Sequence, residues 1–491
     1  MIRKGYKLFN IRGIANLIGK VLLMESAAML ISLLVCLLYC EPDWLAFLLS
    51  AGITGITGFF LGYIVKVKSL SLSQQDGILI TALAWVVVAV FGALPFMVCT
   101  HPVNFTDALF ESMSGFSTTG SSVISDVEAL GKGVNMWRGL TQWIGGLGIV
   151  LFVLTLIPNL NKTGGMRLMA AESSDFTFDK TSPRITQTAR SIALVYVILT
   201  LACILLLWAG PMDLYDSIVH SFATLSTGGF SPYSDGIMHF SSVYVKIVII
   251  IFMLFGGTNF TLMANAGKGD MRSFFCNSTL HIFLLTVVTF TLLCIGSMAM
   301  QGMEFSIDGM VIDPLFTVVS AISSTGFASA NYEGWGKLVF LFLLLLMYSG
   351  ACIGSTSGGA KIDRVIVFFS NCRKEICSSI NTKTLYVVSD GTKQVGAPAV
   401  GRIVTFMGLY ALTLLIGSVL LMVSGIAMGD AFFAVFSCTS NIGLGYGITG
   451  FGGGYALLPE ASKWVLTALM YVGRLELLTV FVLFLPSFWR R

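Results

Sequence analysis

The sequence predicts an all-α polytopic membrane protein built from four similar repeats and two extra N-terminal helices. Of its 491 residues, 55% are hydrophobic and only 11% are charged. Soluble chains carry about 25% charged residues on average. A short helix-forming segment that runs into a Ser/Thr/Gly turn recurs four times, as in FESMSGFSTTGSS and SFATLSTGGF. A recurring unit of this kind fixes an architecture before any single motif does.

Two apolar spans precede the first repeat. They cover residues 21–39 and 44–65 and form an N-terminal unit that we place at residues 1–70. The basic segment 1–20 leads into a run too long for a signal peptide, and no small-residue cleavage site follows it. We therefore expect the first helix to remain as an anchor.

Each repeat is expected to contain a span, a half-length helix, a glycine loop and a second span. We place the repeats at residues 71–184, 185–272, 273–394 and 395–491. The first spans are expected at 77–99, 191–208, 280–300 and 403–423, and the half-length helices at 107–116, 214–225, 313–323 and 430–439. The second spans are expected at 136–157, at 243–263, from 338 onwards, and at 464–485.

A helix of about ten residues is roughly 15 Å long, half the thickness of a bilayer core of about 30 Å. Non-helical backbone at that depth must be buried in protein or line a wet cavity. Span, half-helix, loop and span are typical of the pore loops of cation channels. Four parallel copies therefore predict a pseudo-fourfold pore.

One glycine in each loop would let backbone carbonyls face an axis, because a β-carbon would clash there. Such carbonyls can replace the hydration shell of K⁺, and the negative ends of the half-helices favour a cation. The expected filter comprises Thr118, Thr119, Gly120, Ser226, Thr227, Gly228, Ser324, Thr325, Gly326, Asn441, Ile442 and Gly443. The expected K⁺ ligands are the backbone carbonyls of Thr118, Thr119, Thr227, Gly228, Thr325, Gly326, Asn441 and Ile442.

Acidic residues stand near the start of each half-length helix. We expect Asp107, Asp213, Asp313 and Asp430 to act as N-caps, with cation attraction as a secondary role. The segments predicted to lie outside are acidic, which would concentrate cations at the mouth. The alternative, that acids merely accumulate on the outer side, stays open.

The positions of the basic residues predict the topology. With a cytoplasmic N-terminus, most Lys and Arg fall in cytoplasmic segments, above all 158–190 and 361–402. This is the positive-inside bias, and it places both termini in the cytoplasm.

Two features interrupt the expected spans. Residues 348–361, YSGACIGSTSGGAK, break the last span of the third repeat with a Gly/Ser-rich segment that should line a cavity, unless it is a packing kink. Arg474 lies inside the last span, where a guanidinium is costly and by default functional. We expect Arg474 to face the pore, and the alternative is an ion pair with a buried acid such as Glu111. Gly145, Gly146, Gly148, Gly256 and Gly257 are expected at close-packing positions, with a hinge as the alternative.

Other classes of protein find little support. The ten cysteines form no CxxC motif or His/Cys cluster, so no disulfide framework or zinc site is indicated. No glycine-rich phosphate loop follows a strand, so we expect no nucleotide site in this chain, and the net charge of +4 does not indicate nucleic-acid binding. No pair of acids or nucleophile with a base is placed for an intramembrane enzyme, so we expect none.

The four loops, the N-terminal pair, the Gly/Ser-rich break and Arg474 together resemble the Trk/Ktr/HKT superfamily of K⁺ transporters, specifically the bacterial TrkH/TrkG type of membrane subunit. The resemblance covers essentially the whole chain. It implies K⁺ uptake across the bacterial cytoplasmic (inner) membrane through a gated, channel-like pore, with Gly120 favouring K⁺ over Na⁺. The fourth loop, with Asn441 and Ile442, departs from the Ser-Thr-Gly pattern.

The resemblance also implies a gate, made of an intramembrane loop below the filter and of Arg474 as barrier or latch. The gate residues would be Gly350, Gly354, Ser355, Thr356, Ser357, Gly358, Gly359 and Arg474. It implies a homodimer in the lipid bilayer and a cytosolic RCK/TrkA-type nucleotide-binding regulatory subunit on the basic loops. The alternative function is a Na⁺- or H⁺-coupled K⁺ symporter with broken helices, which predicts inverted repeats and ionisable groups at the site.

Overall fold

The computed structural model describes residues 9–64, 73–148, 185–304, 306–380, 386–391, 393–451 and 453–489. The described residues form helices and loops, with one isolated β-bridge between Ser389 and Gln394. Six of the described helical segments are long and apolar enough to cross a membrane. The predicted all-α polytopic membrane architecture is confirmed.

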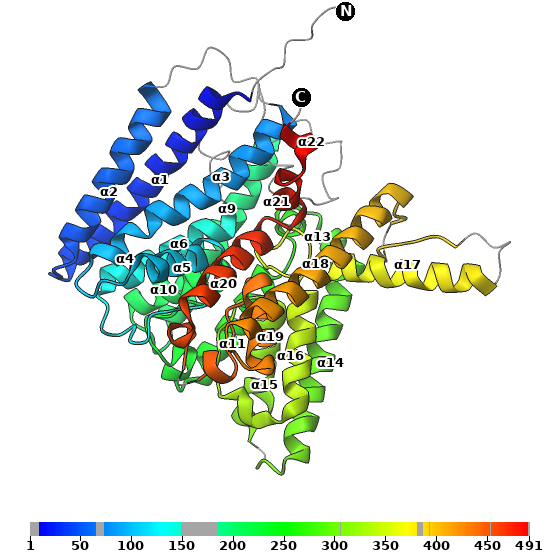
Figure 1. The fold of residues 1–491 in the computed structure, drawn as a ribbon. Helices are drawn as coiled ribbons and strands as arrows, with labels where there is room; N and C mark the ends of the chain where they lie inside the picture. Colours follow the sequence, from blue (N-terminus) through cyan, green and yellow to red (C-terminus); the bar gives the residue numbers. More distant parts are fainter. Residues whose placement is uncertain are drawn as a thin grey trace, which may run out of the picture.

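The N-terminal pair packs side by side at one edge of the molecule (Figure 1). Helix α1 (Ile11–Leu38) begins ten residues before the expected span, where the Asn10 side chain accepts a hydrogen bond from the Gly13 amide at 3.0 Å. The second helix, α2 (Trp44–Phe59), continues into a short π-helical turn, η1 (Phe60–Ile64). The expected basic segment before the first span is thus partly helical.

The first span of every repeat is present. It is formed by α3 (Gln74–Gly92) with α4 (Leu94–Val98), and by α9 (Ile185–Trp208), α14 (Ser278–Met300) and α18 (Ala397–Val423). The half-length helices are α5 (Phe105–Phe116), α10 (Leu214–Leu225), α15 (Asp313–Ile322) and α19 (Met428–Thr439). Their ends agree with the expected segments to within two residues. The proposed repeat boundaries remain a prediction.

The second spans differ from the expectation, because they break half-way. They are α6 (Lys132–Leu147), α11 (Val243–Gly256), α16 (Lys337–Ser349) and α20 (Glu460–Arg474), each 13 to 16 residues long. Glycine with positive φ follows α6 at Gly148 and α16 at Gly350. The next helix, α12 (Phe260–Ala266), leaves α11 at 97°. Glu476 and Leu477, both with positive φ, separate α20 from α21 (Leu478–Leu483).

Only the break in the third repeat was expected. Continuous spans at 243–263 and 464–485 are wrong, and the part of 136–157 beyond Gly148 lies outside the described residues, as does the basic loop up to residue 184. The contacts of the glycines near these helix ends give the physical reason that the helices stop there. In α6, α11 and α20, a glycine near the break packs against the end of the half-helix of its own repeat, so that backbone meets backbone. Gly145 and Gly256, which were expected at close-packing positions, therefore do pack closely, and they lie next to the points where their helices end.

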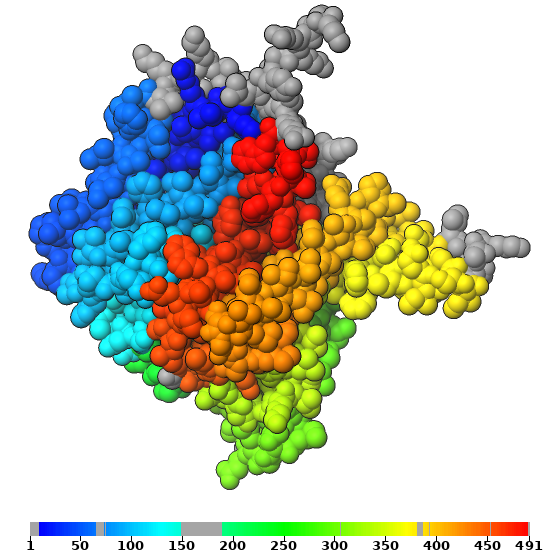
Figure 2. All heavy atoms as spheres, in the orientation of Figure 1, coloured from blue at the N-terminus to red at the C-terminus, as the bar shows by residue number. Residues whose placement is uncertain are grey.

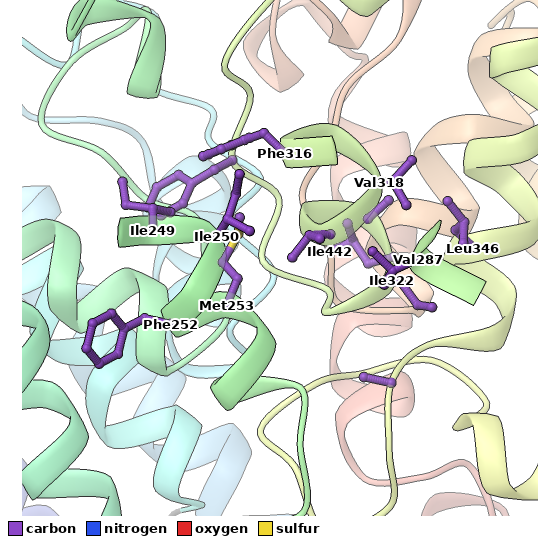
Figure 3. Packing of buried hydrophobic residues seen from close by; sticks show 14 of the residues in the cluster. Ile249, Ile250, Phe252, Met253, Val287, Phe316, Val318, Ile322, Leu346 and Ile442 are labelled. Atoms are coloured by element: carbon purple, nitrogen blue, oxygen red, sulfur yellow. The ribbon is translucent and has the colours of Figure 1, made fainter. Parts of the chain in front are cut away.

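The half-helices lie in the centre and are buried by the spans around them. Figure 3 shows this core between α11 and α15, where Ile249, Ile250 and Met253 lie near Phe316. The buried Ile442, from the fourth loop, lies beside Val318 and Ile322 of α15. Apolar side chains from three repeats thus hold the centre of the molecule together.

Helix α17 (Ile362–Ile380) projects from the body (Figures 1 and 2). It carries the exposed apolar side chains Phe369, Ile376 and Ile380. At the other side, Phe9 before α1 packs against Phe488 of α22 (Pro486–Trp489) with ring centroids 5.8 Å apart. The two described ends of the chain are therefore in contact.

Candidate functional site

The four half-helices end in the same way. Each has a serine as its C-cap, and the next residue adopts a left-handed conformation with φ between 53° and 57°. The amide after that residue turns back and donates to a carbonyl of the helix; for Thr119 the acceptor is Ser114 O at 2.9 Å, and for Thr325 it is Ser320 O at 2.9 Å. The C-caps are Ser117, Ser226, Ser323 and Ser440, and the left-handed residues are Thr118, Thr227, Ser324 and Asn441.

A glycine with positive φ stands two residues after each left-handed residue. These glycines are Gly120, Gly229, Gly326 and Gly443, with φ between 80° and 86°. The expected equivalence of Gly228 is therefore wrong by one residue, and Gly229 takes that place in the second loop. The sequence contained the signal: a serine lies three residues before the glycine in every loop, and counting from Ser226 leads to Gly229.

The four loops close into a ring. A β-carbon at Gly120 would overlap the carbonyl oxygen of Gly228, one at Gly229 that of Thr325, one at Gly326 that of Ile442, and one at Gly443 that of Thr119. Each loop thus faces the next, and the fourth returns to the first. This cyclic order is the one that the predicted pseudo-fourfold arrangement of parallel repeats would produce.

The ring aligns the candidate ligands in two layers. One layer holds the left-handed residues, and the other holds Thr119, Gly228, Thr325 and Ile442. The expected carbonyls of the first, second and fourth loops fall in these two layers. In the third loop the equivalent pair is Ser324 and Thr325, so the expected Gly326 is shifted by one residue.

Left-handed backbone is strained for β-branched residues such as Thr118 and Thr227. Each side chain offsets part of that cost by donating its hydroxyl to the carbonyl before it: Thr118 to Ser117 O at 2.6 Å, and Thr227 to Ser226 O at 2.7 Å. Hydroxyl residues at this position therefore hold the backbone turn.

A buried ion pair, missed in the sequence, supports the first loop. Arg138 of α6 binds Glu111 of α5 at 2.8 Å, and both side chains are buried. Glu111 also accepts from the Val123 amide at 3.0 Å, and Arg138 donates to Ser231 O, next to the second loop, at 2.8 Å. The pair links two neighbouring loops. Glu111 is therefore engaged by Arg138, and the suggested pairing of Glu111 with Arg474 is not what the structure has.

The acids near the half-helix starts have varied roles. Only Asp213 caps its helix, accepting the Asp216 amide at 2.7 Å, whereas Asn104 caps α5, and α15 and α19 have no side-chain cap. Asp107 binds Lys463 of α20, and Asp313 binds Lys246 of α11 at 2.8 Å. Asp430 lies near the Ile448 amide at 3.4 Å. The expectation of four aspartate caps is wrong for three of them: neighbouring helices supply cations to Asp107 and Asp313, and Asp430 lies near a backbone amide.

The Gly/Ser-rich segment 348–361 lies against the ends of the half-helices. The Thr356 hydroxyl lies 3.2 Å from Thr227 Oγ1 of the second loop, and the Gly358 amide donates to Ser324 Oγ of the third loop at 2.7 Å. A β-carbon at Gly358 would overlap Ser440 O of the fourth repeat. The segment therefore touches three of the four loops directly.

Within this segment the backbone folds back on itself. The Ala360 amide donates to Tyr348 O at 3.1 Å, and Gly350 and Gly359 have positive φ where the two arms cross. The remaining expected gate residues lie along the turn: Gly354 O accepts the Phe260 amide of α12 at 3.0 Å, and Ser355 and Ser357 join their hydroxyls at 2.8 Å.

Arg474 completes the contact with the first loop. Its guanidinium donates to Thr118 Oγ1 at 3.1 Å, to Thr356 O at 3.0 Å and to Gly145 O of α6. The guanidinium also lies over the ring of Trp85, 5.6 Å from its centroid. Arg474 of α20 thus joins the first loop, the 348–361 segment and α6. Glu476, two residues on, binds Arg364 of α17 at 2.6 Å.

Similar proteins of known family identify the family of this chain. The family model of TrkH, described as a cation transport protein, matches residues 53–491. The chain belongs to the TrkH family. The family is one of cation transport proteins, and the apolar helices of this chain indicate a multi-pass membrane protein.

Relatives and a solved structure match along the whole chain. The Trk system potassium uptake protein TrkH of Escherichia coli is 31% identical over 482 residues, with 98% of this chain and 99% of the relative covered. TrkI of Halomonas elongata, also a Trk system potassium uptake protein, is 33% identical over 468 residues, covering 94% of each chain. The crystal structure of the potassium transporter TrkH from Vibrio parahaemolyticus superimposes with a TM-score of 0.89 at 28% identity, covering 98% of this chain and 100% of that one.

Proposed function

We propose that this TrkH-family protein mediates K⁺ uptake through a channel-like pore whose selectivity filter is the ring of four glycine loops. The observation that carries the proposal is the closed cycle in which each loop glycine faces the carbonyl oxygen of the next loop. A ring of backbone carbonyls suits a cation that sheds its water, and K⁺ sheds water in such filters. The names of the relatives agree with K⁺ as the transported ion.

The filter ligands in this proposal are the carbonyls of the two layers defined above. One of them, Gly228 O, already accepts a hydrogen bond from Gln142 at 2.6 Å. A carbonyl oxygen has two lone pairs, so it can hold one donor and still face an ion. The buried half-helices point their negative ends at the same place.

The segment 348–361 and Arg474 act as the gate in this proposal. Their hydrogen bonds to Thr118, Thr227 and Ser324, one in each of the first three loops, support this role. A guanidinium beside a narrow cation path raises the energy of an entering K⁺. Opening would require the segment to withdraw and Arg474 to turn away.

We further propose a bacterial inner-membrane location with both termini in the cytoplasm, a homodimer, and regulation by a cytosolic nucleotide-binding subunit. The basic bias of the segments on one side supports the orientation. The projecting α17, with exposed Phe369 and Ile376, offers a surface that a second protein chain could cover.

Ion flux in proteoliposomes that contain the purified chain tests the proposal. Downhill K⁺ and Rb⁺ flux that exceeds Na⁺ flux without a proton gradient is expected. Flux that requires a proton or sodium gradient would instead establish the coupled symporter. Because a missing regulator could hold the pore shut, the same assay is run on a gate-opening variant described in the Discussion.

Replacement of Gly120 by serine tests the filter itself. The new side chain would press on Gly228 O, so the Na⁺ to K⁺ flux ratio should rise. An unchanged ratio in folded protein would remove the ring from the role of filter.

A further inference from the structure

The second filter loop differs from the other three at one position. The residue before the loop glycine carries a side chain in the first, third and fourth loops, where it is Thr119, Thr325 or Ile442, but it is Gly228 in the second. Ile442 packs into the core beside Ile322 (Figure 3). Thr119 and Thr325 bond through their hydroxyls to the C-cap serines of their own loops, at 2.7 and 2.8 Å. The side chain at this position therefore stabilises its loop from behind.

In the second loop that space is filled by Gln142 of α6, which belongs to the first repeat. A β-carbon at Gly228 would lie 2.5 Å from Gln142 Cδ, so the glutamine occupies the place of the missing side chain. Gln142 is fully buried. Its amide nitrogen donates to Gly228 O at 2.6 Å, and its amide oxygen accepts from the Phe230 amide at 3.1 Å.

These two hydrogen bonds bracket Gly229, the ring glycine of the loop. They fix the direction of one carbonyl that faces the first loop, and they do so with a neutral amide whose nitrogen and oxygen each make one of the two hydrogen bonds. A buried polar pair of this kind holds one geometry, because loss of either partner leaves a buried group without a hydrogen bond.

The equivalent positions in the second and fourth repeats carry no polar side chain. Gly145, Gly256 and Gly473 each pack against the carbonyl that precedes a C-cap serine, which aligns α6, α11 and α20. Counting three residues back from these glycines gives Gln142, Met253 and Met470. The glutamine therefore accompanies the second loop, in which position 228 is a glycine.

We propose that Gln142 is a positioning residue for ion selectivity: its carboxamide replaces the missing side chain at Gly228 and sets the orientation of the Gly228 carbonyl. The inference rests on the ring of loops acting as the filter. It predicts that selectivity between K⁺ and Na⁺ depends on a side chain that does not touch the ion.

The first test compares Gln142→Leu with Met253→Leu in proteoliposomes. The leucine keeps the volume at position 142 but removes both hydrogen bonds, and Met253→Leu places the same residue at the equivalent site of α11. A hydrogen bond contributes about 0.5–1.5 kcal/mol net, so the Na⁺ to K⁺ flux ratio should rise about 2- to 10-fold in Gln142→Leu. The ratio should not change in Met253→Leu.

The second test rebuilds the loop. Gly228→Thr alone should impair transport, because its β-carbon meets Gln142. Combined with Gln142→Ala, the threonine gains the space it has in the first and third loops, and the double variant should recover selectivity beyond what the two single effects add up to. This test applies even where Gln142→Leu is unstable in detergent.

The outcomes separate the two proposals. Suppose that Gly120→Ser alters the Na⁺ to K⁺ flux ratio. A wild-type ratio in folded Gln142→Leu, or strictly additive effects in the double variant, would then overturn the role of Gln142 and leave the filter proposal in place. A wild-type protein without K⁺ preference, or a Gly120→Ser variant with an unchanged ratio, overturns the filter, and the role of Gln142 falls with it.

Discussion

The four repeats are alike in the ring of glycine loops but differ in the layer beneath it, which contains the 348–361 segment and Arg474. In the ring, all four repeats supply a serine cap, a left-handed residue and a glycine in the same order. Beneath it, among the described residues, the third repeat alone inserts a Gly/Ser-rich segment and the fourth alone supplies an arginine to it. The four repeats are equivalent where their backbone surrounds one axis. They are not equivalent where side chains reach that axis from one side.

This difference has a physical reason. A single ion held by backbone carbonyls needs ligands from all sides, and only the backbone is common to the four repeats. A barrier needs one element that can move and one charge, and four arginines close together would repel each other. The comparison therefore predicts that changes in the ring act through geometry, whereas changes beneath it act through charge and hydrogen bonds.

The largest effect is expected for a β-carbon in the ring. In Gly326→Ala the new methyl group would overlap Ile442 O, in a backbone conformation with φ of 80° that alanine rarely adopts. Strain and a displaced carbonyl together should cost about 3 kcal/mol, which lowers the K⁺ transport rate about 100-fold. The transport rate of Gly326→Ala is measured as Rb⁺ uptake into proteoliposomes.

Gly425→Ala is the matched control for that change. Gly425 also has a positive φ, of 90°, but nothing lies within 4 Å of its missing β-carbon. Its replacement should lower stability by about 1–2 kcal/mol through backbone strain alone and leave ion selectivity unchanged. If both variants behave alike, the contact across the ring is not what makes Gly326 necessary.

The ring could be predicted from the sequence, apart from its register in one loop. Four glycines after four half-length helices indicated the architecture, since such a pattern repeats along the chain. In the second loop, Gly228 and Gly229 are both candidates for the ring glycine. The choice falls on Gly229 only when positions are counted from Ser226. The unexpected breaks in 243–263 and 464–485 escaped detection because apolar runs continue through them, and periodicity does not register a bend.

Tertiary partners were the least predictable part. Asp107 and Asp313 stand near helix starts, where capping is the usual role, but Lys463 and Lys246 arrive from other helices and bind them. In the same way, the sequence shows an arginine inside an apolar span but not that Arg474 contacts Thr118 and Thr356. Contacts between residues hundreds of positions apart depend on the packing of whole helices.

The next largest effect is expected for the charge beneath the ring. Gln in place of Arg474 keeps a hydrogen-bonding side chain and removes the charge. A unit charge about 4 Å from an ion is worth about 4 kcal/mol at an effective dielectric constant of 20, so loss of even a third of it should raise basal K⁺ flux about 10-fold. The flux is measured on the purified chain without its partners.

Lysine at the same position separates charge from geometry. Arg474→Lys keeps the positive charge but cannot reach Thr118, Thr356 and Gly145 with one planar fork. Flux as low as in the wild type would assign the barrier to charge. Flux as high as in Arg474→Gln would assign it to the hydrogen bonds that hold the 348–361 segment.

A smaller effect is expected for one hydroxyl of that segment. Thr356 Oγ1 lies within hydrogen-bonding distance of Thr227 Oγ1, Leu225 O and Gly256 O, whereas its carbonyl is what binds Arg474. Thr356→Val should loosen the segment by about 0.5–1 kcal/mol and raise basal flux about 2- to 5-fold. Thr258→Val is the control, because the Thr258 hydroxyl bonds only along its own helix, to Leu254 O. Equal flux in the two variants would show that the segment is not held at the second loop.

The smallest effect is expected outside the fourfold arrangement, at the buried acid Glu25 of the N-terminal pair, and Glu111 of the first repeat serves as the contrast. Glu111 is paired with Arg138, but Glu25 of α1 is buried with both carboxylate oxygens lacking a hydrogen-bond partner among the described residues. We expect Glu25 to be carried as the neutral acid, because a buried carboxylate without a partner is costly to keep ionised. Glu25→Gln should therefore change the free energy of unfolding by less than about 0.5 kcal/mol, whereas Glu111→Gln, which strands a buried arginine, should cost about 3 kcal/mol.

Thermal unfolding in detergent and K⁺ uptake between pH 6 and pH 8 measure both variants. If Glu25→Gln alters the pH dependence of uptake, a proton on Glu25 takes part in transport, and the asymmetry beneath the ring extends to the N-terminal pair. If it alters neither stability nor uptake, α1 serves as a scaffold, and the functional asymmetry is confined to the 348–361 segment, Arg474 and the glutamine behind the second loop.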